Sequence, residues 1–137
     1  MTKIAVVTGA NRGLGLATSQ ALAEKGYKVY MLGRKLAELQ AAAEPLKKRG
    51  LKVEAVLGDI TSEPQLQNFA AHLRETGEAV DALINNAGVF LDPADTTNAE
   101  NASIFTADLS VVTKSFEINT MGPLRVTQIL KPFLEKS

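Results

Sequence analysis

The alternation of short apolar runs with longer segments of helical periodicity constrains the fold most. The runs suit buried strands, and the segments between them place apolar residues three and four positions apart. The predicted strands are Ile4–Val7, Lys28–Leu32, Lys52–Leu57 and Val80–Ile84. The predicted helices cover residues 13–25, 35–49, 62–76 and 108–136. Strands and helices in alternation predict βαβ units, and therefore an α/β fold with a doubly wound parallel sheet.

Individual residues predict how these helices begin, end and bend. The first helix is expected to bury a face made of Leu14, Ala17, Ala21 and Leu22. Pro45 has no N–H to donate, which predicts a kink or break just before it. Ser62 is a typical N-cap residue, with Gln65 three residues later as in a capping box. Asp108 is a typical N-cap residue as well. Residues 92–103, rich in Asp, Thr, Asn and Ala, are predicted to form a surface loop.

Composition narrows the function. The 137 residues suit a single domain, and the 15 basic and 15 acidic residues balance, which gives no indication of nucleic acid as a partner. There is no cysteine, and the single histidine, His72, has no grouped carboxylates, so we expect no metal site. No stretch approaches the roughly 18–20 apolar residues of a membrane span. The expected partner is therefore not a membrane, and the expected compartment is the cytoplasm.

A glycine-rich turn, Thr8–Gly15, joins the first predicted strand to the first helix. Gly9, Gly13 and Gly15 allow a tight turn and a close approach of the backbone to a diphosphate. The N–H groups and the dipole of the following helix would favour that negative charge. A strand-to-helix loop that merely contains three glycines is the alternative interpretation. The strand before the turn and the helix after it favour nucleotide binding.

The spacing of this turn, T-G-x-x-x-G-x-G, resembles the signature of the short-chain dehydrogenase/reductase family. Asp59-Ile60-Thr61 after the third strand resembles the family's Asp-aliphatic-Thr/Ser segment, and Asn85-Asn86-Ala87-Gly88 is its N-N-A-G. Asn119, three residues before Gly122, resembles the family's N-x-x-G. These matches occur in the family's order and span residues 8–122.

The resemblance implies a Rossmann-type fold with strand order 3-2-1-4, in which residues 1–137 form an NADP(H)-binding domain that stops before the fifth strand. It implies a hydride-transferring oxidoreductase acting on a small carbonyl or alcohol substrate, and it allows a homo-oligomer. Asn119 is the expected catalytic residue. The expected cofactor-binding residues are Gly9, Asn11, Arg12, Gly13, Leu14, Gly15, Arg34, Asp59, Ile60, Asn86, Ala87 and Gly88.

Basic residues at the end of the second strand favour NADP(H) over NAD(H). An NAD site generally places an acidic side chain there to accept from the ribose 2′-hydroxyl. This chain has Arg34 and Lys35 instead, with no acidic residue before Glu38. Arg12 in the glycine turn could reach the same place, and guanidinium groups suit a 2′-phosphate. The alternative is that Arg34 and Lys35 merely begin a solvated helix.

Pro123 predicts a distortion of the last helix near Asn119. In a regular helix the N–H of residue 123 would bond the carbonyl of residue 119, and proline has no N–H. Gly122 weakens the helix further. The resemblance implies that a distortion here serves catalysis by holding a water. Two other interpretations remain open: Gly122-Pro123 begins a new helix, or the bend serves packing alone.

The Ser, Tyr and Lys that the family uses for catalysis are not found in this chain. Its two tyrosines, Tyr27 and Tyr30, lie at the second strand, and neither is followed by Lys four positions later. We expect the chain to be the cofactor-binding half of a reductase, inactive alone, with an incompletely covered last helix. The alternative is a non-catalytic nucleotide-binding module or sensor that ends at Ser137.

Overall fold

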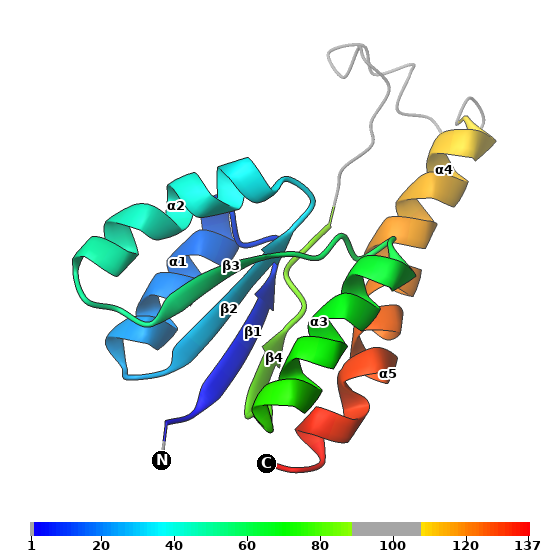
Figure 1. Cartoon of the computed structure of the whole chain (residues 1–137). Coiled ribbons are helices and arrows are strands. Elements are labelled where there is room, and N and C mark those ends of the chain that lie inside the picture. Colours follow the sequence, from blue (N-terminus) through cyan, green and yellow to red (C-terminus); the bar gives the residue numbers. More distant parts are fainter. Residues whose placement is uncertain (1, 89–107) are drawn as a thin grey trace.

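A parallel sheet with the strand order β3-β2-β1-β4 forms the centre of the computed structural model, which describes residues 2–88 and 108–137 (Figure 1). The strands are β1 (Ile4–Thr8), β2 (Lys28–Gly33), β3 (Val53–Leu57) and β4 (Ala82–Ile84). Every pairing among them is parallel, with Val6 opposite Tyr30 and Leu83. The predicted fold class and strand order are confirmed.

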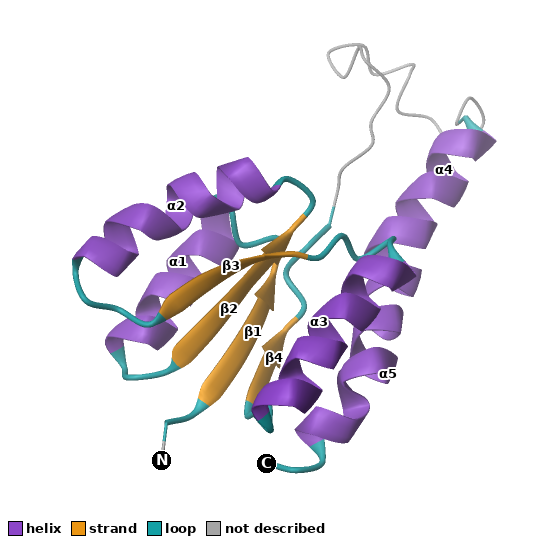
Figure 2. Cartoon of the chain, in the orientation of Figure 1, coloured by secondary structure: helices purple, strands orange, loops and turns teal. Residues whose placement is uncertain are grey.

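Helices cover both faces of this sheet (Figure 2). They are α1 (Gly13–Glu24), α2 (Leu36–Lys48), α3 (Glu63–Thr76), α4 (Leu109–Phe116), the π-helix η2 (Glu117–Met121) and α5 (Gly122–Leu134). Alternate side chains of a strand point to opposite faces. Thus Val7 and Met31 pack with buried residues of α1 and α2, whereas Val6 and Leu32 pack with those of α3 and α5. Each face has its own apolar core, as a doubly wound sheet requires.

The structure differs from the sequence-based prediction in α2. We expected a kink or break before Pro45; there is no break, because one continuous helix runs through it from Leu36 to Lys48. Leu39, Ala43 and Leu46 are buried along the inner face of this helix, whereas Pro45 is exposed. Packing of that inner face against the sheet therefore continues on both sides of the proline and holds the helix together.

The last predicted helix contains a distortion where Pro123 predicted one. Residues 117–121 form η2, between α4 and α5, so Asn119 lies within a π-helical turn. Pro123 also lies in the first turn of α5, so the alternative in which Gly122-Pro123 begins a helix is borne out as well. The predicted caps, Ser62 and Asp108, accept hydrogen bonds from Gln65 N and Ser110 N. The predicted loop over 92–103 lies outside the described residues.

The predicted apolar face of α1 is wrong for three of its four residues, because only Leu22 packs against the core. Leu14 is 75% exposed, and Ala17 and Ala21 are exposed as well, whereas Gly15, Ser19 and Ala23 are buried. The Ser19 hydroxyl donates to the carbonyl of Gly15 at 2.8 Å, which satisfies it within the helix. Gly15 must be small because the glycine turn lies so close to it, and Leu16 and Leu22 complete the contact of α1 with the core.

A polar cluster lies beside the core at Tyr30, whose ring is fully buried. The Tyr30 hydroxyl donates to the Glu78 carboxylate at 2.5 Å and lies 3.3 Å from Nε2 of His72. Lys28 pairs with Glu78 at 3.0 Å. His72 is half-buried against the Tyr30 ring. Burial, with the hydrogen bond to Glu78, raises the pKa of Tyr30 to about 12.

Apolar side chains along α4 and the start of α5 are exposed. Leu109 is 78% exposed, Phe116 is 59% exposed, and Val112 and Leu124 are about half exposed. The expectation that the last helix is incompletely covered is confirmed for these residues.

Gly15→Ala is expected to destabilise the fold by roughly 3 kcal/mol or more, because backbone must move to admit a methyl group. A Cβ at Gly15 would lie 2.2 Å from the Gly9 carbonyl oxygen and 2.5 Å from Nδ2 of Asn86. In an unobstructed helix the same change would stabilise by about 1 kcal/mol. Urea unfolding measures the difference. The control is Gly13→Ala, which meets nothing within 4 Å and costs about 1–2 kcal/mol for its positive φ. Equal losses would contradict the steric explanation.

Tyr30 is expected to keep its proton until the pH approaches about 12 in the folded chain. An unfolded tyrosine loses its proton near pH ~10. Between these values the unfolded state binds fewer protons, so stability falls as the pH rises. Ultraviolet titration of tyrosinate in Tyr27→Phe, which leaves Tyr30 as the single tyrosine in a chain without tryptophan, measures this directly. Ionisation of Tyr30 in the native chain at the same pH as in denaturant would contradict the burial of its hydroxyl.

Candidate functional site

A pocket of about 590 Å³ opens at the carboxyl ends of the strands. Its walls come from the turn after β1, the β2–α2 junction, the loop after β3, the turn after β4, and the α4–η2 segment. The lining residues are Gly9, Asn11, Arg12, Gly13, Gly33, Arg34, Lys35, Glu38, Gly58, Asp59, Ile60, Thr61, Asn86, Ala87, Gly88, Lys114, Glu117 and Ile118. In an open parallel sheet, ligands bind at this edge, where the strand order reverses. Here the reversal lies between β1 and β4.

The turns that follow β1 and β4 are locked together at the reversal point. The Thr8 hydroxyl accepts from Asn86 N at 3.1 Å and from Ala87 N at 3.0 Å. Nδ2 of Asn86 donates to the Gly9 carbonyl at 3.1 Å. Gly9 has a φ of +60°, and a Cβ there would lie 2.8 Å from Ala87 Cα. Only glycine therefore allows these turns to approach so closely.

Two helices begin at the pocket without a side-chain cap. The N-cap residues Arg12 of α1 and Lys35 of α2 make no capping hydrogen bond from their side chains, unlike Ser62 of α3 and Asp108 of α4. Backbone N–H groups in the first turn of a helix need a partner, and an anion can supply it. Gly13, with a φ of +57° and open space around it, begins α1. The pocket thus offers two helix N-termini suited to anionic groups.

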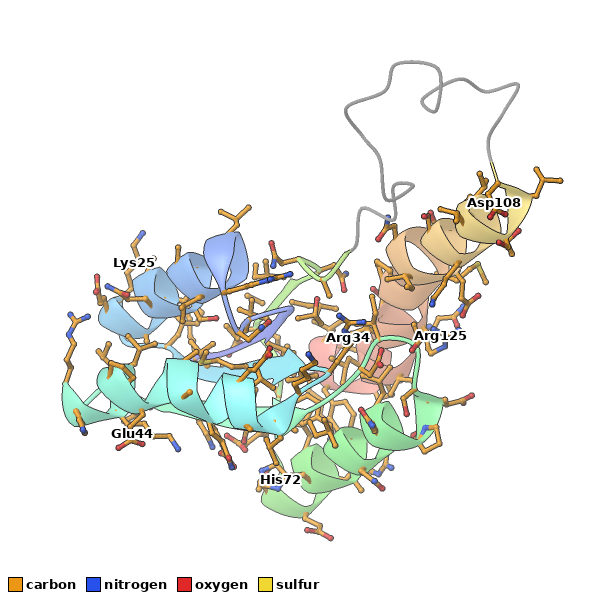
Figure 3. The ribbon with its side chains drawn as sticks, turned by 90° about the horizontal axis from the view of Figure 1, so that it is seen from above. Lys25, Arg34, Glu44, His72, Asp108 and Arg125 are labelled. Atoms are coloured by element: carbon orange, nitrogen blue, oxygen red, sulfur yellow. The ribbon has the colours of Figure 1, made fainter. Side chains whose placement is uncertain are left out.

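Positive charge gathers where β2 meets α2. Arg34 directly follows β2, and Figure 3, which looks down on the carboxyl ends of the strands, labels it at the centre of the molecule. Arg12 and Lys35 line the same pocket. Among them lies the carboxylate of Glu38, which accepts from Nδ2 of Asn11 at 3.0 Å and lies 3.6 Å from Nζ of Lys35.

Asp59 is held in a fixed position after β3. Its Oδ1 accepts from Thr61 N at 2.9 Å and from the Thr61 hydroxyl at 2.8 Å. Its backbone N–H donates to Oε1 of Gln65 at 2.8 Å. The first turn of α3 therefore orients this carboxylate, which lines the pocket.

The η2 segment forms another wall of the pocket, through Glu117 and Ile118. A Cβ added to Gly88 would lie 3.1 Å from Oδ1 of Asn119, so this amide lies beside the turn after β4. Arg125 of α5 donates to the Ile60 carbonyl at 2.6 Å and to Glu117 at 2.7 Å. The Arg125 side chain therefore connects the loop after β3 to η2.

Most of the predicted site residues come together in this one pocket. Gly9, Asn11, Arg12, Gly13, Arg34, Asp59, Ile60, Asn86, Ala87 and Gly88 line it. Leu14 and Gly15 do not: Leu14 points to solvent and Gly15 is buried behind the turn. Asn119 is not a lining residue but adjoins Gly88.

Sequence reasoning missed several residues of the walls. Lys114, Glu117 and Ile118 line the pocket, and their spacing from Asn119 on one predicted helix could have indicated them. In the sequence Glu38 is only the first acidic residue after Arg34, whereas in the structure it lies in the first turn of α2 and lines the pocket. The contact between Glu38 and Asn11 joins positions 27 residues apart and has no signal in the sequence.

The part of the chain that the structure describes does not support a metal site, a membrane-spanning helix or proton transfer by Tyr30. Residues 2–88 and 108–137 contain no group of His, Cys, Asp or Glu arranged to hold a metal ion. Within the same ranges no helix has the length and apolarity to cross a bilayer. Tyr30 faces away from this pocket, in the core with α3, and its raised pKa is the opposite of what a proton-transferring phenol needs.

Comparisons with known proteins agree on one family. The family model described as short chain dehydrogenase matches residues 3–137. The short-chain dehydrogenase/reductase PhomF′ of Diaporthe leptostromiformis is 31% identical over 85% of this chain and 41% of its own length. VdtF of Byssochlamys spectabilis, a protein of the same description, is 33% identical over 98% of this chain and 47% of its own length. The chain thus spans less than half the length of these curated relatives.

A solved structure gives the same result. L-sorbose reductase from Gluconobacter frateurii, crystallised with NADPH and L-sorbose, is 26% identical and superposes with a TM-score of 0.82. The match covers 98% of this chain and 48% of that one. Together with the glycine turn, the strand order and the pocket at the strand reversal, these matches show that the chain belongs to the short-chain dehydrogenase/reductase family of oxidoreductases.

Proposed function

We propose that this chain is the cofactor-binding portion of an NADP(H)-dependent oxidoreductase that interconverts a carbonyl compound and an alcohol. The observation that carries the NADP(H) preference is that Arg12, from the turn after β1, and Arg34, at the end of β2, line the same pocket. A 2′-phosphate brings almost two negative charges, which guanidinium groups bind well. The NADPH in the L-sorbose reductase structure is consistent with this proposal.

A dinucleotide would extend across this pocket. Gly13 leaves room for a diphosphate at the start of α1, where backbone N–H groups have no side-chain cap. Arg34 and Lys35 would hold the 2′-phosphate, and Asp59 would accept from the adenine amino group. The nicotinamide would lie toward the turn that ends at Gly88. When bound, NADP(H) supplies a hydride to a carbonyl carbon or accepts one from an alcohol.

Asn119 is the residue of this chain that we assign to catalysis. It lies next to Gly88, which lines the pocket, and within a π-helical turn. Distorted helical turns of this kind occur often at functional sites. We propose that Asn119 helps to hold a water through which a proton reaches the substrate.

The remaining catalytic groups would come from residues outside this chain. The two tyrosines here, Tyr27 and Tyr30, lie at β2 and do not line the pocket. The small share of the relatives' length that the chain spans, and the exposed apolar residues of α4, support a longer natural protein. We therefore propose that the 137-residue chain binds the cofactor but does not turn it over.

Arg34→Ala is expected to weaken NADPH binding by roughly tenfold or more, because a charge-assisted hydrogen bond to phosphate is lost. NADH lacks the 2′-phosphate, so its affinity should hardly change. Calorimetric titration of the wild-type chain and the variant with each dinucleotide measures this. Arg74→Ala, an exposed arginine of α3 outside the pocket, is the control. Equal binding of NADH and NADPH by the wild type would refute the proposed preference.

Asp59→Ala should weaken NADPH and NADH to the same extent, by roughly tenfold, because both carry adenine. The control is Thr61→Val, which removes the hydroxyl that donates to Asp59 and keeps the carboxylate. The same titrations report both variants. A loss confined to NADPH would place Asp59 at the phosphate and contradict its assignment to adenine.

A further inference from the structure

Glu38 differs from the other acidic residues that line the pocket. Glu117 is paired with Arg125, and Asp59 accepts from Thr61, so neither contacts a basic residue that lines the pocket. Glu38 instead bridges two walls: it accepts from Asn11 of the glycine turn at 3.0 Å and approaches Lys35 of its own helix at 3.6 Å. Its carboxylate is thus located among the basic groups expected to bind phosphate.

The position of Glu38 has two electrostatic consequences. It partly neutralises Lys35, which could otherwise serve an incoming anion. It also places a negative charge on the wall that an additional phosphate would approach, and like charges repel. Its side chain is 52% exposed, so water screens both effects without abolishing them. A ligand without that phosphate meets neither penalty.

We infer that Glu38 is a specificity-determining residue that limits how strongly this pocket prefers a 2′-phosphorylated adenosine to an unphosphorylated one. The inference rests on the proposed function, which places a 2′-phosphate at Arg34 and Lys35. Arg12 and Arg34 attract the 2′-phosphate, and the negative charge of Glu38 weakens that attraction. Glu38 therefore reduces the difference in affinity between the phosphorylated and the unphosphorylated ligand.

Glu38→Gln tests this inference with little change of shape. The glutamine amide oxygen can still accept from Asn11, so the bridge between the walls is kept while the charge is removed. Glu44→Gln is the matched control, because Glu44 lies on the same helix, is exposed, and does not line the pocket. Figure 3 shows it on the outer side of α2, away from Arg34. Both variants change the net charge of the chain equally.

The probes are adenosine 2′,5′-bisphosphate and adenosine 5′-monophosphate, which differ only in the 2′-phosphate, titrated calorimetrically into the whole 137-residue chain. Glu38→Gln should bind the bisphosphate on the order of five- to tenfold more tightly than the wild type, and the monophosphate within about twofold. The gain should shrink as salt is added. Glu44→Gln should match the wild type. An unchanged or weaker affinity of Glu38→Gln for the bisphosphate, or an equal gain in Glu44→Gln, would overturn the inference.

These outcomes separate the inference from the proposed function. A wild-type chain that binds the monophosphate as tightly as the bisphosphate refutes the NADP(H) preference. A selective gain in Glu38→Gln would even then support the role of Glu38, because that comparison is between variants. A wild-type chain that binds neither probe overturns both proposals.

Discussion

The close contact between the turn after β1 and the turn after β4 is the constraint on which the rest of the site depends. The Thr8 hydroxyl accepts two backbone N–H groups from the β4 turn, and Asn86 returns a hydrogen bond to Gly9. This junction fixes the start of α1 relative to the last strand of the sheet. Without it, the glycine turn and the Asn-Asn-Ala-Gly turn could not form one wall of a pocket.

The packing of α1 follows from the same junction. Because Gly15 lies against the Gly9 carbonyl, the inner face of α1 must be small at this position, and Ser19 and Ala23 continue that face. Leu16 and Leu22 are partly buried against the core, whereas Leu14 is exposed.

Much of the fold could be predicted from the sequence, because periodicity and turn chemistry are local properties. The four strands, the caps at Ser62 and Asp108, and the distortion beside Pro123 belong to this class. The burial of α1 could not be predicted, because it depends on how close a distant turn lies. The continuity of α2 through Pro45 could not be predicted either, since packing against the sheet outweighs the missing hydrogen bond.

The candidate site, like the fold, has a part that the sequence predicts and a part that it does not. Ten of the predicted residues line the pocket, because the family motifs place them at the carboxyl ends of the strands. The contacts that arrange the walls join residues far apart in the sequence, as Arg125 joins Ile60 across 65 positions. Charge balance is also a property of the assembled pocket: Glu38 becomes important only once folding brings Asn11 to it.

The π-helix has a geometric consequence for the segment that contains it. A π-helical turn takes up one more residue than an α-helical turn, so the helix that follows is rotated by about 100° relative to an uninterrupted one. The apolar residues of α4 and those of α5 therefore point in different directions around the axis. Val126, Leu130 and Phe133 turn toward the sheet, whereas Leu109, Val112 and Phe116 turn outward. Because of one extra residue, these apolar side chains of α5 face the sheet while those of α4 face outward.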